Sequence, residues 1–524
     1  MQYYQPIYFL VFLPIVMLLY SIVPKIHRWK VLLLASYIFF FSISRFLIVY
    51  LLISTVLIHY FGLWLNTIVN EKKQKMKECE KTQKKLVKQY YQKKQWRIVL
   101  LGILIHMGLL IVLKYSAFIE TNMNILLNHF HITYQLPIHQ FLVPIGISFY
   151  TLQAVSYMID IYRGSLQADH NLGRLALFMS FFPIIMEGPI CRYQDTASPL
   201  YEGKPLEYQN TKFGFQRIAY GMMKKMIVAD RLDILVKNIF TNYAQYDGIL
   251  IALGAICYTC QLYMEFSGTM DMVIGSAEIF GVKLPENFKQ PFFSRSISEF
   301  WTRWHITLGT WFKDYIYFSM SLSHPLRKLT AFGRKHLGNY YGPLMSGTIA
   351  LFCVWFCNGI WHGEDWNYIF FGLYHFVLIL LGNLIMPMAQ KNPLRHSYVY
   401  HGFQMLRTAC LVCVGELFFR AEGLKAGLEM FYKMMTDFHW NALSIDAVVS
   451  LGLDRHDLLI IVIVVLIVLM ISVYKEKGVH IREWIAKRPI IMRWTLYYAI
   501  IFMIIIFGAY GYGYVPVDPI YAGF

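Results

Sequence analysis

Charged side chains are scarce in this sequence. Only 15% of its 524 residues are Asp, Glu, Lys or Arg, whereas 57% are hydrophobic and 17% are aromatic. So few charges cannot cover the surface of a soluble globule of this length. The composition therefore excludes a soluble globular protein and predicts an integral membrane protein.

The sequence also lacks internal repeats, low-complexity tracts and Gly/Ser-rich linkers that would set apart a soluble domain. Long apolar runs follow one another instead. A helix needs roughly 20 apolar residues to cross the hydrocarbon core, and the runs predict about ten to twelve transmembrane helices, with re-entrant or interfacial helices among them. We therefore expect an all-α integral membrane protein in which residues 1–524 form a single domain.

Cysteine is sparse, and its spacing indicates no metal site. Two of the eight cysteines form the pair Cys257/Cys260, and two more form Cys410/Cys413. This CxxC spacing is typical of zinc ligands in soluble chains. Here both pairs lie in apolar runs, where cysteine is an ordinary small packing residue. We expect neither a metal nor a disulfide framework.

Basic residues are concentrated in one block. The formal net charge is +17, and its densest part is EKKQKMKECEKTQKKLVKQYYQKKQWR, residues 71–97. The block lies between two apolar runs, so the positive-inside rule predicts a cytoplasmic loop at 70–97 rather than a nucleic-acid surface. A turn near residues 42–45 would then place the N-terminus outside the membrane. The first apolar segment would be a membrane anchor that stays in the protein rather than a cleaved signal peptide. The block is expected to be a solvated helical loop, with contact to anionic membrane lipid as the alternative.

Residues 283–318 combine polar and aromatic side chains. An aromatic face at helical spacing comprises Trp301, Trp304, Leu308, Trp311, Phe312 and Tyr315. Arg303, Lys313 and Asp314 lie off this face. The pattern predicts one helix at the membrane boundary or half inserted into the membrane.

Titratable side chains recur within the apolar and aromatic segments. They are Asp160, Glu187, Glu265, Asp271, Glu299, His305, Asp314, His362 and His375. Such groups are costly at membrane depth and indicate a transport path or an active site. Plainer interpretations stay open: Asp160 as a partner of Arg163, Asp271 as a scaffold residue, and His375 as a hydrogen-bonded core histidine.

The stretch FCNGIWHGEDW (356–366) carries the strongest single candidate. His362 follows Asn358, Gly359 and Trp361 and precedes Gly363, so other groups can approach its ring. An imidazole titrating near neutrality is a common general base. Asn358, one turn earlier, could donate to an oxyanion, and the acids at 364 and 365 would orient the next helix.

Two motifs resemble a known family. FWTRWHITLGTWFKDY (300–315) and NGIWHGEDWNYIFFGLYHF (358–376) resemble the hallmark motifs of the membrane-bound O-acyltransferases, MBOAT, and more narrowly of their bacterial AlgI-type branch. Segments such as VPIGISFYTLQAVSYMIDIYRG (143–164) extend the likeness over almost the full length. The resemblance implies a central funnel, a catalytic core at about 140–385, and acyl transfer from a cytoplasmic thioester to an acceptor outside.

The resemblance also implies roles for residues. His362 matches the catalytic histidine of the WHG motif, and His305 matches the second motif histidine. Trp361 and Asn358 would orient groups or stabilise the oxyanion. Glu265 and Thr302 depart from the Asp and Arg usual in the branch, and the tail PIYAGF (519–524) is also atypical.

Further candidates belong to the two ends of the proposed transfer. The donor side would include Arg303, Lys313 and Asp314, since Arg and Lys suit a phosphorylated donor arm. Tyr521 in the tail would assist or relay the acyl group.

The expected function is membrane O-acetylation of an exported or cell-surface polysaccharide, such as an alginate-like exopolysaccharide. No cofactor would be resident, because acetyl-CoA or an acyl-carrier thioester serves as co-substrate. Expected partners are the donor, an extracytoplasmic SGNH-type acetyltransferase or the polysaccharide itself, and membrane lipid, with no nucleic acid. The protein would be multi-pass in the cell (inner or plasma) membrane. Alternatives are DltB-like D-alanyl transfer to teichoic acid, a transporter or flippase, and a non-catalytic scaffold.

Overall fold

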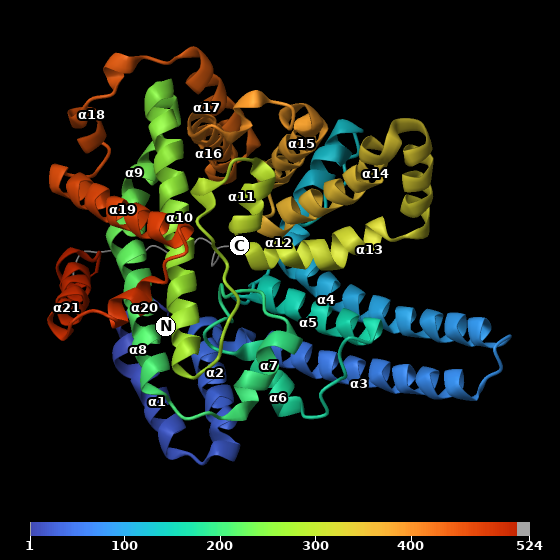
Figure 1. Ribbon diagram of the computed structural model, residues 1–524. Helices are drawn as coiled ribbons and strands as arrows, with labels where there is room; N and C mark the ends of the chain where they lie inside the picture. Colours follow the sequence, from blue (N-terminus) through green and yellow to red (C-terminus); the bar gives the residue numbers. More distant parts are fainter. Residues whose placement is uncertain (1, 511–524) are drawn as a thin grey trace. The chain divides into compact units, whose positions relative to one another are not determined.

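The computed structural model describes residues 2–510, which are mostly helical (Figure 1). Within this range there is no β-strand, and Phe288 and Trp304 form one isolated antiparallel bridge. Eight helices in this range are long and apolar enough to cross a membrane: Lys25–Glu78, Lys84–His129, Gly248–Ile279, His324–His362, Trp366–Ala389, Tyr398–Arg420, Arg455–Glu476 and Ile490–Phe507. The prediction of an all-α membrane protein is confirmed.

The number of long helices differs from the expected ten to twelve crossings for two reasons. Lys25–Glu78 contains two helices, because the chain turns at Arg45 (φ 47°) as the sequence predicts. Two of the apolar runs, near residues 150 and 180, fall on α5 and α6, which have 17 and 9 residues. These helices are shorter than a bilayer crossing requires.

The chain divides into two compact units, and their boundaries fall within α8 and α10. The first unit comprises the residues up to Phe215 with Val273–Pro285, and the second comprises Gln216–Met272 with the chain from Glu286 onward. The first contains a π-helical turn Tyr8–Phe12, α1 Leu13–Ile22, α2 Arg28–Ser44, α3 Ile48–Glu78, α4 Lys84–His129, α5 Ile147–Arg163, α6 Leu172–Ser180 and α7 Tyr193–Glu202; α8 Tyr208–Met222 and α10 Gly248–Ile279 contribute to both. The expectation of a single domain stays a prediction.

The second unit contains the remaining helices. They are α9 Asp230–Thr241, α11 Ile297–Arg303, α12 Ile306–Phe312, α13 Phe318–Ser321, α14 His324–His362, α15 Trp366–Ala389, α16 Tyr398–Arg420, α17 Leu424–Thr436, α18 Ile445–Val449, α19 Arg455–Glu476, α20 Ile481–Ala486 and α21 Ile490–Phe507, with π-helical turns at Met223–Ala229 and Lys313–Tyr317. Short 3₁₀ turns lie in several of the connections.

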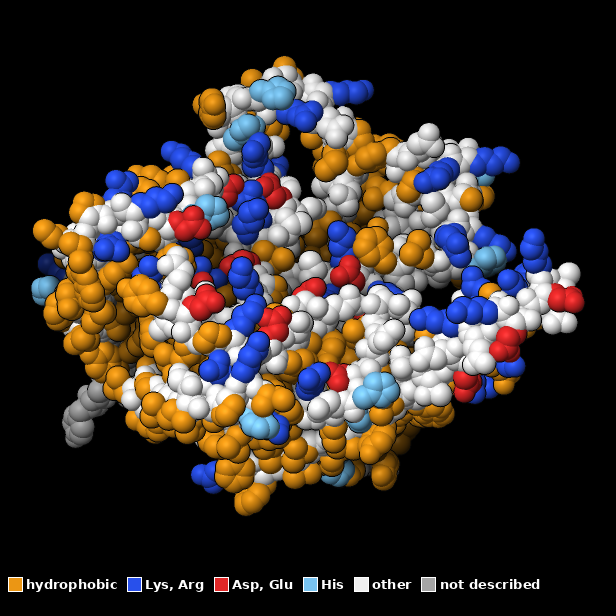
Figure 2. Space-filling model, turned by 60° about the horizontal axis from the view of Figure 1, so that its bottom comes forward, with side chains coloured by type: hydrophobic (Ala, Val, Ile, Leu, Met, Phe, Trp, Pro, Cys, Tyr) orange, Lys and Arg blue, Asp and Glu red, His pale blue; other side chains and the backbone are white. Residues whose placement is uncertain are grey.

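The basic block of the first unit is helical. α3 continues to Glu78, and α4 begins at Lys84, so only the intervening turn is non-helical. Most side chains of the block are exposed, and Figure 2 shows Lys and Arg side chains along this helical pair. The interpretation as an exposed helical segment is confirmed, and its cytoplasmic location stays a prediction.

Glycines bring the helices of the second unit close together. A Cβ on Gly221 of α8 would lie 2.4 Å from the carbonyl oxygen of Gly268 in α10. A Cβ on Gly372 of α15 would lie 2.3 Å from the carbonyl oxygen of Trp355 in α14. Small residues at such crossings allow the van der Waals packing that holds membrane helices together. The α14–α15 crossing lies next to the segment that carries His362.

Candidate active site

The RWH segment is not one continuous helix, contrary to the sequence prediction. α11 ends at Arg303, Trp304 is extended, and His305 has a left-handed backbone with φ 46°. The break pairs with the preceding segment: Lys289 N–H donates to Arg303 O at 2.9 Å, and Ile306 N–H donates to Asn287 O at 3.0 Å. A non-glycine residue at positive φ is uncommon, and such strain clusters at functional sites.

The aromatic residues of this segment also differ from the expected interfacial face. Trp304 and Trp311 are each only 3% exposed, and Trp304 stacks with the ring of Phe300. A residue of a membrane-interface belt keeps its polar tip in the interfacial region. The aromatic side chains of Trp304 and Trp311 pack within the protein instead.

His305 is buried beside Asn287, a residue that sequence reasoning does not single out. Asn287 Oδ1 accepts hydrogen bonds from the backbone N–H and the hydroxyl of Thr307 at 3.0 and 2.9 Å. His305 Nδ1 lies 3.3 Å from the same oxygen, so Nδ1 must be the donor. Burial lowers the pKa of His305 to about 3. The ring is therefore neutral at physiological pH and presents an unprotonated Nε2.

His362 is the last residue of α14, and Gly359 and Gly363 lie close to it in the sequence. A Cβ on Gly359 would lie 2.6 Å from Tyr368 O, and a Cβ on Gly363 would overlap the Tyr368 ring. Asp365 then caps α15, with its carboxylate accepting from Trp366 N–H. The predicted role of this acid in starting the next helix is confirmed.

The two histidines of the motifs share one aromatic neighbour. The Trp361 ring lies 5.0 Å from the His362 ring and 5.8 Å from the His305 ring, centroid to centroid. His362 is 3% exposed and also contacts the rings of Phe371 at 5.9 Å and Phe419 at 5.1 Å. The fold thus brings together two residues that are 57 positions apart in the sequence, with Trp361 between them.

Asn358 lies one helical turn before His362 in α14, as predicted. Its side chain is buried, and Oδ1 has no hydrogen-bond partner within residues 2–510. Buried amide atoms are rarely left unpaired, and such an atom needs a functional or structural explanation. A substrate N–H or O–H group would supply the missing donor, whereas the oxyanion role needs the Asn358 Nδ2–H group and stays a prediction.

His375 is a hydrogen-bonded core histidine, as the plainer interpretation has it. Trp301 Nε1–H donates to His375 Nδ1 at 3.2 Å, and the two rings lie 4.9 Å apart. Phe371 contacts both the His375 ring, at 4.7 Å, and the His362 ring. This hydrogen bond ties α11 to α15 and so links the two segments that carry the motif histidines.

Replacing Trp301 by phenylalanine is expected to lower the free energy of unfolding by about 1–3 kcal/mol, because His375 Nδ1 loses its buried donor. The double variant Trp301→Phe/His375→Leu should cost less than the sum of the two single changes. Thermal unfolding of the four proteins in one detergent measures this coupling. Strictly additive effects would show that the hydrogen bond does not hold the two helices.

The donor-side candidates are not equivalent. Arg303 is held by Glu299 at 2.9 Å and by Glu476 of α19 at 2.8 Å. Lys313 is exposed, with its amine 5.8 Å from the Phe318 ring, and Asp314 is half-buried. Arg303 would have to exchange a carboxylate for a donor phosphate, whereas Lys313 is accessible without such a change.

The other titratable candidates fall into separate groups. Asp160 and Glu187 belong to the first unit and are buried there. Asp271 accepts from Arg217 at 2.8 Å and from Lys224 at 2.7 Å, which favours its scaffold interpretation over the site interpretation.

Sequence reasoning misses two buried lysines in the π-helical turn Met223–Ala229. Lys224 pairs with Asp271, and Lys225 pairs with Asp230 at 2.7 Å and Glu265 at 3.0 Å. Their only signal in the sequence is a charged pair inside the apolar run GMMKKMIVA. π-Helical turns are rare and occur often at functional sites.

Replacing Lys225 by methionine is expected to destabilise the protein by about 3–5 kcal/mol, because two buried carboxylates lose their partner. The matched control is Lys425→Met, since the Lys425 side chain is 92% exposed. Thermal unfolding in detergent should separate the two variants clearly. Equal midpoints would contradict the structural role of the Lys225 pair.

Tyr521 lies outside the described residues. Among residues 2–510, no group of three or more His, Cys, Asp or Glu side chains is arranged to hold a metal ion. All eight cysteines are free thiols.

The fold and the site together define a multi-pass membrane protein with a buried, histidine-centred site. The model of the membrane-bound O-acyltransferase family matches residues 163–332, a range that includes His305 and ends before His362. A relative named "Probable alginate O-acetylase AlgI" from Pseudomonas putida is 31% identical over 460 residues, which is 88% of this chain and 85% of the relative. The chain belongs to the membrane-bound O-acyltransferase family and is an acyltransferase.

Two further relatives are named for other activities. A peptidoglycan O-acetyltransferase from Helicobacter pylori is 28% identical over 371 residues, which is 66% of this chain and 65% of the relative. A teichoic acid D-alanyltransferase from Bacillus subtilis is 31% identical and covers 49% of this chain and 62% of its own. Both similarities span less of this chain than the similarity to the Pseudomonas protein.

Proposed function

We propose that this protein passes an acetyl group from a cytoplasmic thioester to an acceptor outside the membrane, for the O-acetylation of an exported or cell-surface polysaccharide. The observation that carries the proposal is the buried pair His305 and His362, with Trp361 between them. The long match to an alginate O-acetylase supports acetate as the group and polysaccharide as the acceptor.

In the proposed reaction, His362 accepts the proton of the attacking hydroxyl. The hydroxyl oxygen forms a bond to the thioester carbonyl carbon, and the carbon–sulfur bond breaks. His362 then returns the proton to the departing thiolate, so an ester and a free thiol result. Asn358 would donate to the oxyanion of the tetrahedral intermediate. His305 would accept a hydrogen bond at Nε2 and orient the hydroxyl or the thiol.

The donor would be acetyl-CoA or an acetyl-carrier thioester, with no resident cofactor. Lys313 and Arg303 would contact its phosphate groups, and Asp314 would order that contact. Tyr521 would assist transfer on the outer side. There the acceptor is the polysaccharide or an SGNH-type acetyltransferase that passes the group on.

D-alanyl transfer is the second candidate, supported by the Bacillus relative. Mass spectrometry of surface polymers from the parent strain, a deletion strain and the complemented deletion strain separates acetylation from D-alanylation. Acetylation predicts lost acetate with unchanged alanine. Lost alanine with unchanged acetate would overturn the proposal in favour of D-alanylation.

A further inference from the structure

Several turns of the second unit meet at one end, the end where α14 finishes at His362. A Cβ on Gly423, between α16 and α17, would lie 3.7 Å from Asp365 Oδ2. Glu422 accepts from the Thr241 hydroxyl at 3.4 Å, at the end of α9. Gly248 N–H, at the start of α10, donates to Asp437 O at 2.7 Å. We call the segments 242–247, 363–365 and 421–454 the acidic end; the last of them includes α17 and α18.

The two ends of this unit carry opposite charge. The acidic end contains eight Asp or Glu residues and two Lys or Arg residues. At the opposite end lie the connections 390–397, between α15 and α16, and 477–489, between α19 and α21. Together they contain six Lys or Arg residues and one Glu. The positive-inside rule assigns the Lys/Arg-rich connections to the cytoplasm. The acidic end is therefore the outer end, where an exported acceptor would arrive.

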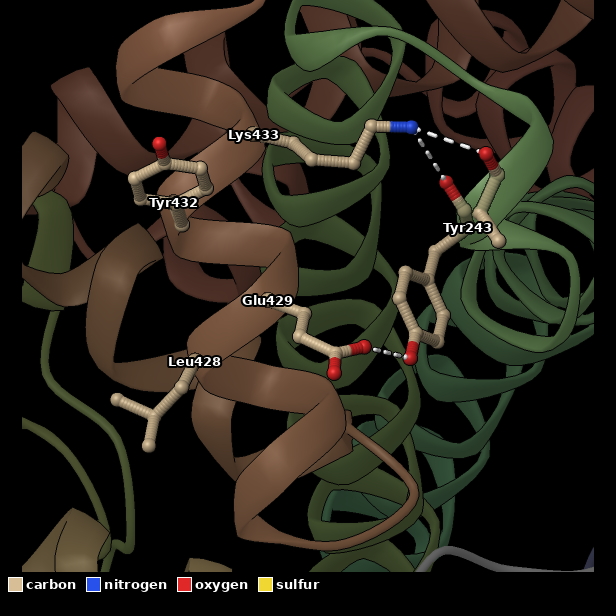
Figure 3. Close-up of a pocket in the computed structure, with 6 residues that line it drawn as sticks. Tyr243, Leu428, Glu429, Tyr432 and Lys433 are labelled. Carbon is tan, nitrogen blue, oxygen red and sulfur yellow. Dashed lines mark hydrogen bonds between the residues drawn. The ribbon is translucent and has the colours of Figure 1, made fainter.

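A groove with a volume of about 440 Å³ lies at this end, between α17 and the turn after α9 (Figure 3). Its lining residues are Tyr243, Ala244, Leu428, Glu429, Tyr432 and Lys433. In Figure 3, Glu429 and Lys433 reach from α17 toward the turn, and Leu428 and Tyr432 lie on the other side of the helix. The volume is within the range of ordinary ligand sites.

The polar groups of the groove are held in place by the fold. Glu429 Oε2 accepts from the Tyr243 hydroxyl at 2.5 Å. Lys433 Nζ donates to the carbonyl oxygens of Ala244 at 3.0 Å and Tyr246 at 2.5 Å. By contrast, the Tyr432 side chain is 67% exposed. The groove lining thus combines one exposed aromatic ring with a carboxylate that accepts from the Tyr243 hydroxyl and lies 3.8 Å from the Lys425 amine.

This lining suits a sugar chain better than a purely apolar ligand. The C–H faces of a sugar ring pack against an aromatic face, whose π-electrons attract the positively polarised hydrogens, while the hydroxyls at the ring edge bond to a carboxylate. A polyanionic chain is disfavoured, because the eight acids of this end outnumber its two bases and like charges at close range carry a cost.

We propose that this groove is an acceptor subsite that holds a segment of an uncharged glycan and selects against uronate or phosphate polymers. The proposal deepens the proposed function and rests on it for the identity of the acceptor. It distinguishes this protein's acceptor from alginate, the polymer in the name of its Pseudomonas relative.

Binding is tested on the full chain in nanodiscs, without donor, by saturation-transfer NMR and titration. The probes are a neutral β-1,4-glucan hexamer and a β-1,4-linked uronate hexamer at low salt. The neutral hexamer should bind, and Tyr432→Ala should weaken it about fivefold to tenfold. The uronate hexamer should bind more weakly and gain affinity in Glu429→Gln, because that change removes one repelling charge.

The matched control is Tyr398→Ala, a 92% exposed tyrosine at the opposite end of α16, which should bind like the wild type. Equal effects of Tyr432→Ala and Tyr398→Ala, tighter binding of the uronate hexamer, or no binding of the neutral hexamer would each overturn the subsite. Because no donor is present, this result is independent of acyl transfer. If the proposed function itself is wrong, the deletion strain will show unchanged polymer acetate.

Discussion

Cells that carry His362→Ala are expected to lose polymer acetylation by a factor of about 10²–10⁴, the usual contribution of a general base. The His362 ring is buried among Trp361, Phe371 and Phe419, so no exposed residue can take its place. Released acetate per unit of polymer measures the effect.

The control for this variant is His456→Ala, because the His456 side chain is 96% exposed at the start of α19. Both variants must be present in the membrane at the wild-type level and unfold at similar temperatures in detergent. With those conditions met, wild-type acetate in the His362 variant would remove His362 from the chemistry.

Asn358→Leu is expected to lower the transfer rate by about 10²–10³, the typical cost of losing one oxyanion donor. Stability should not fall in parallel. Within the described chain the Asn358 Oδ1 atom is buried without a partner, and an apolar side chain of similar shape removes that penalty. The diagnostic result is therefore a slow enzyme with an unchanged or raised unfolding temperature. Initial rates of acetyl transfer and unfolding midpoints are measured on the same preparation.

A second substitution sharpens the test of Asn358. Asn358→Asp should be at least as slow as Asn358→Leu, because a carboxylate repels the oxyanion. The exposed residue Asn441 supplies the control Asn441→Leu, which should transfer at the wild-type rate. An Asn358→Asp protein as fast as the wild type would show that the amide donates to no developing charge.

Much of the fold could be predicted because the bilayer imposes its own rules. Continuous apolar runs must be helical where no water can satisfy the backbone. The turn at Arg45 and the helical ends of α3 and α4 follow from that rule and from the charge of the block. The short helices α5 and α6 did not follow, because hydropathy measures apolar length and not where the backbone stops being helical.

The site was predictable only in part, for a physical reason. His362 stands out because two glycines interrupt its helix, and the structure ends α14 there. The break at His305 was missed because Trp301, Trp304, Leu308 and Trp311 recur at helical spacing, whereas tertiary pairing with residues 287–289 decides the backbone. The partners Asn287, Lys224 and Lys225 depend on contacts between distant segments, and periodicity carries no information on those contacts.

The central proposal is that His362, as general base, catalyses transfer of an acetyl group from a thioester on one side of the membrane to an acceptor on the other. Single-turnover transfer in proteoliposomes tests it most directly. Labelled acetyl-CoA is placed on the side of the membrane that carries the 390–397 and 477–489 connections, and a glycan on the side that carries the acidic end. We expect label on the glycan with the wild type and with His456→Ala, and none above background with His362→Ala. Equal label with His362→Ala would contradict the account.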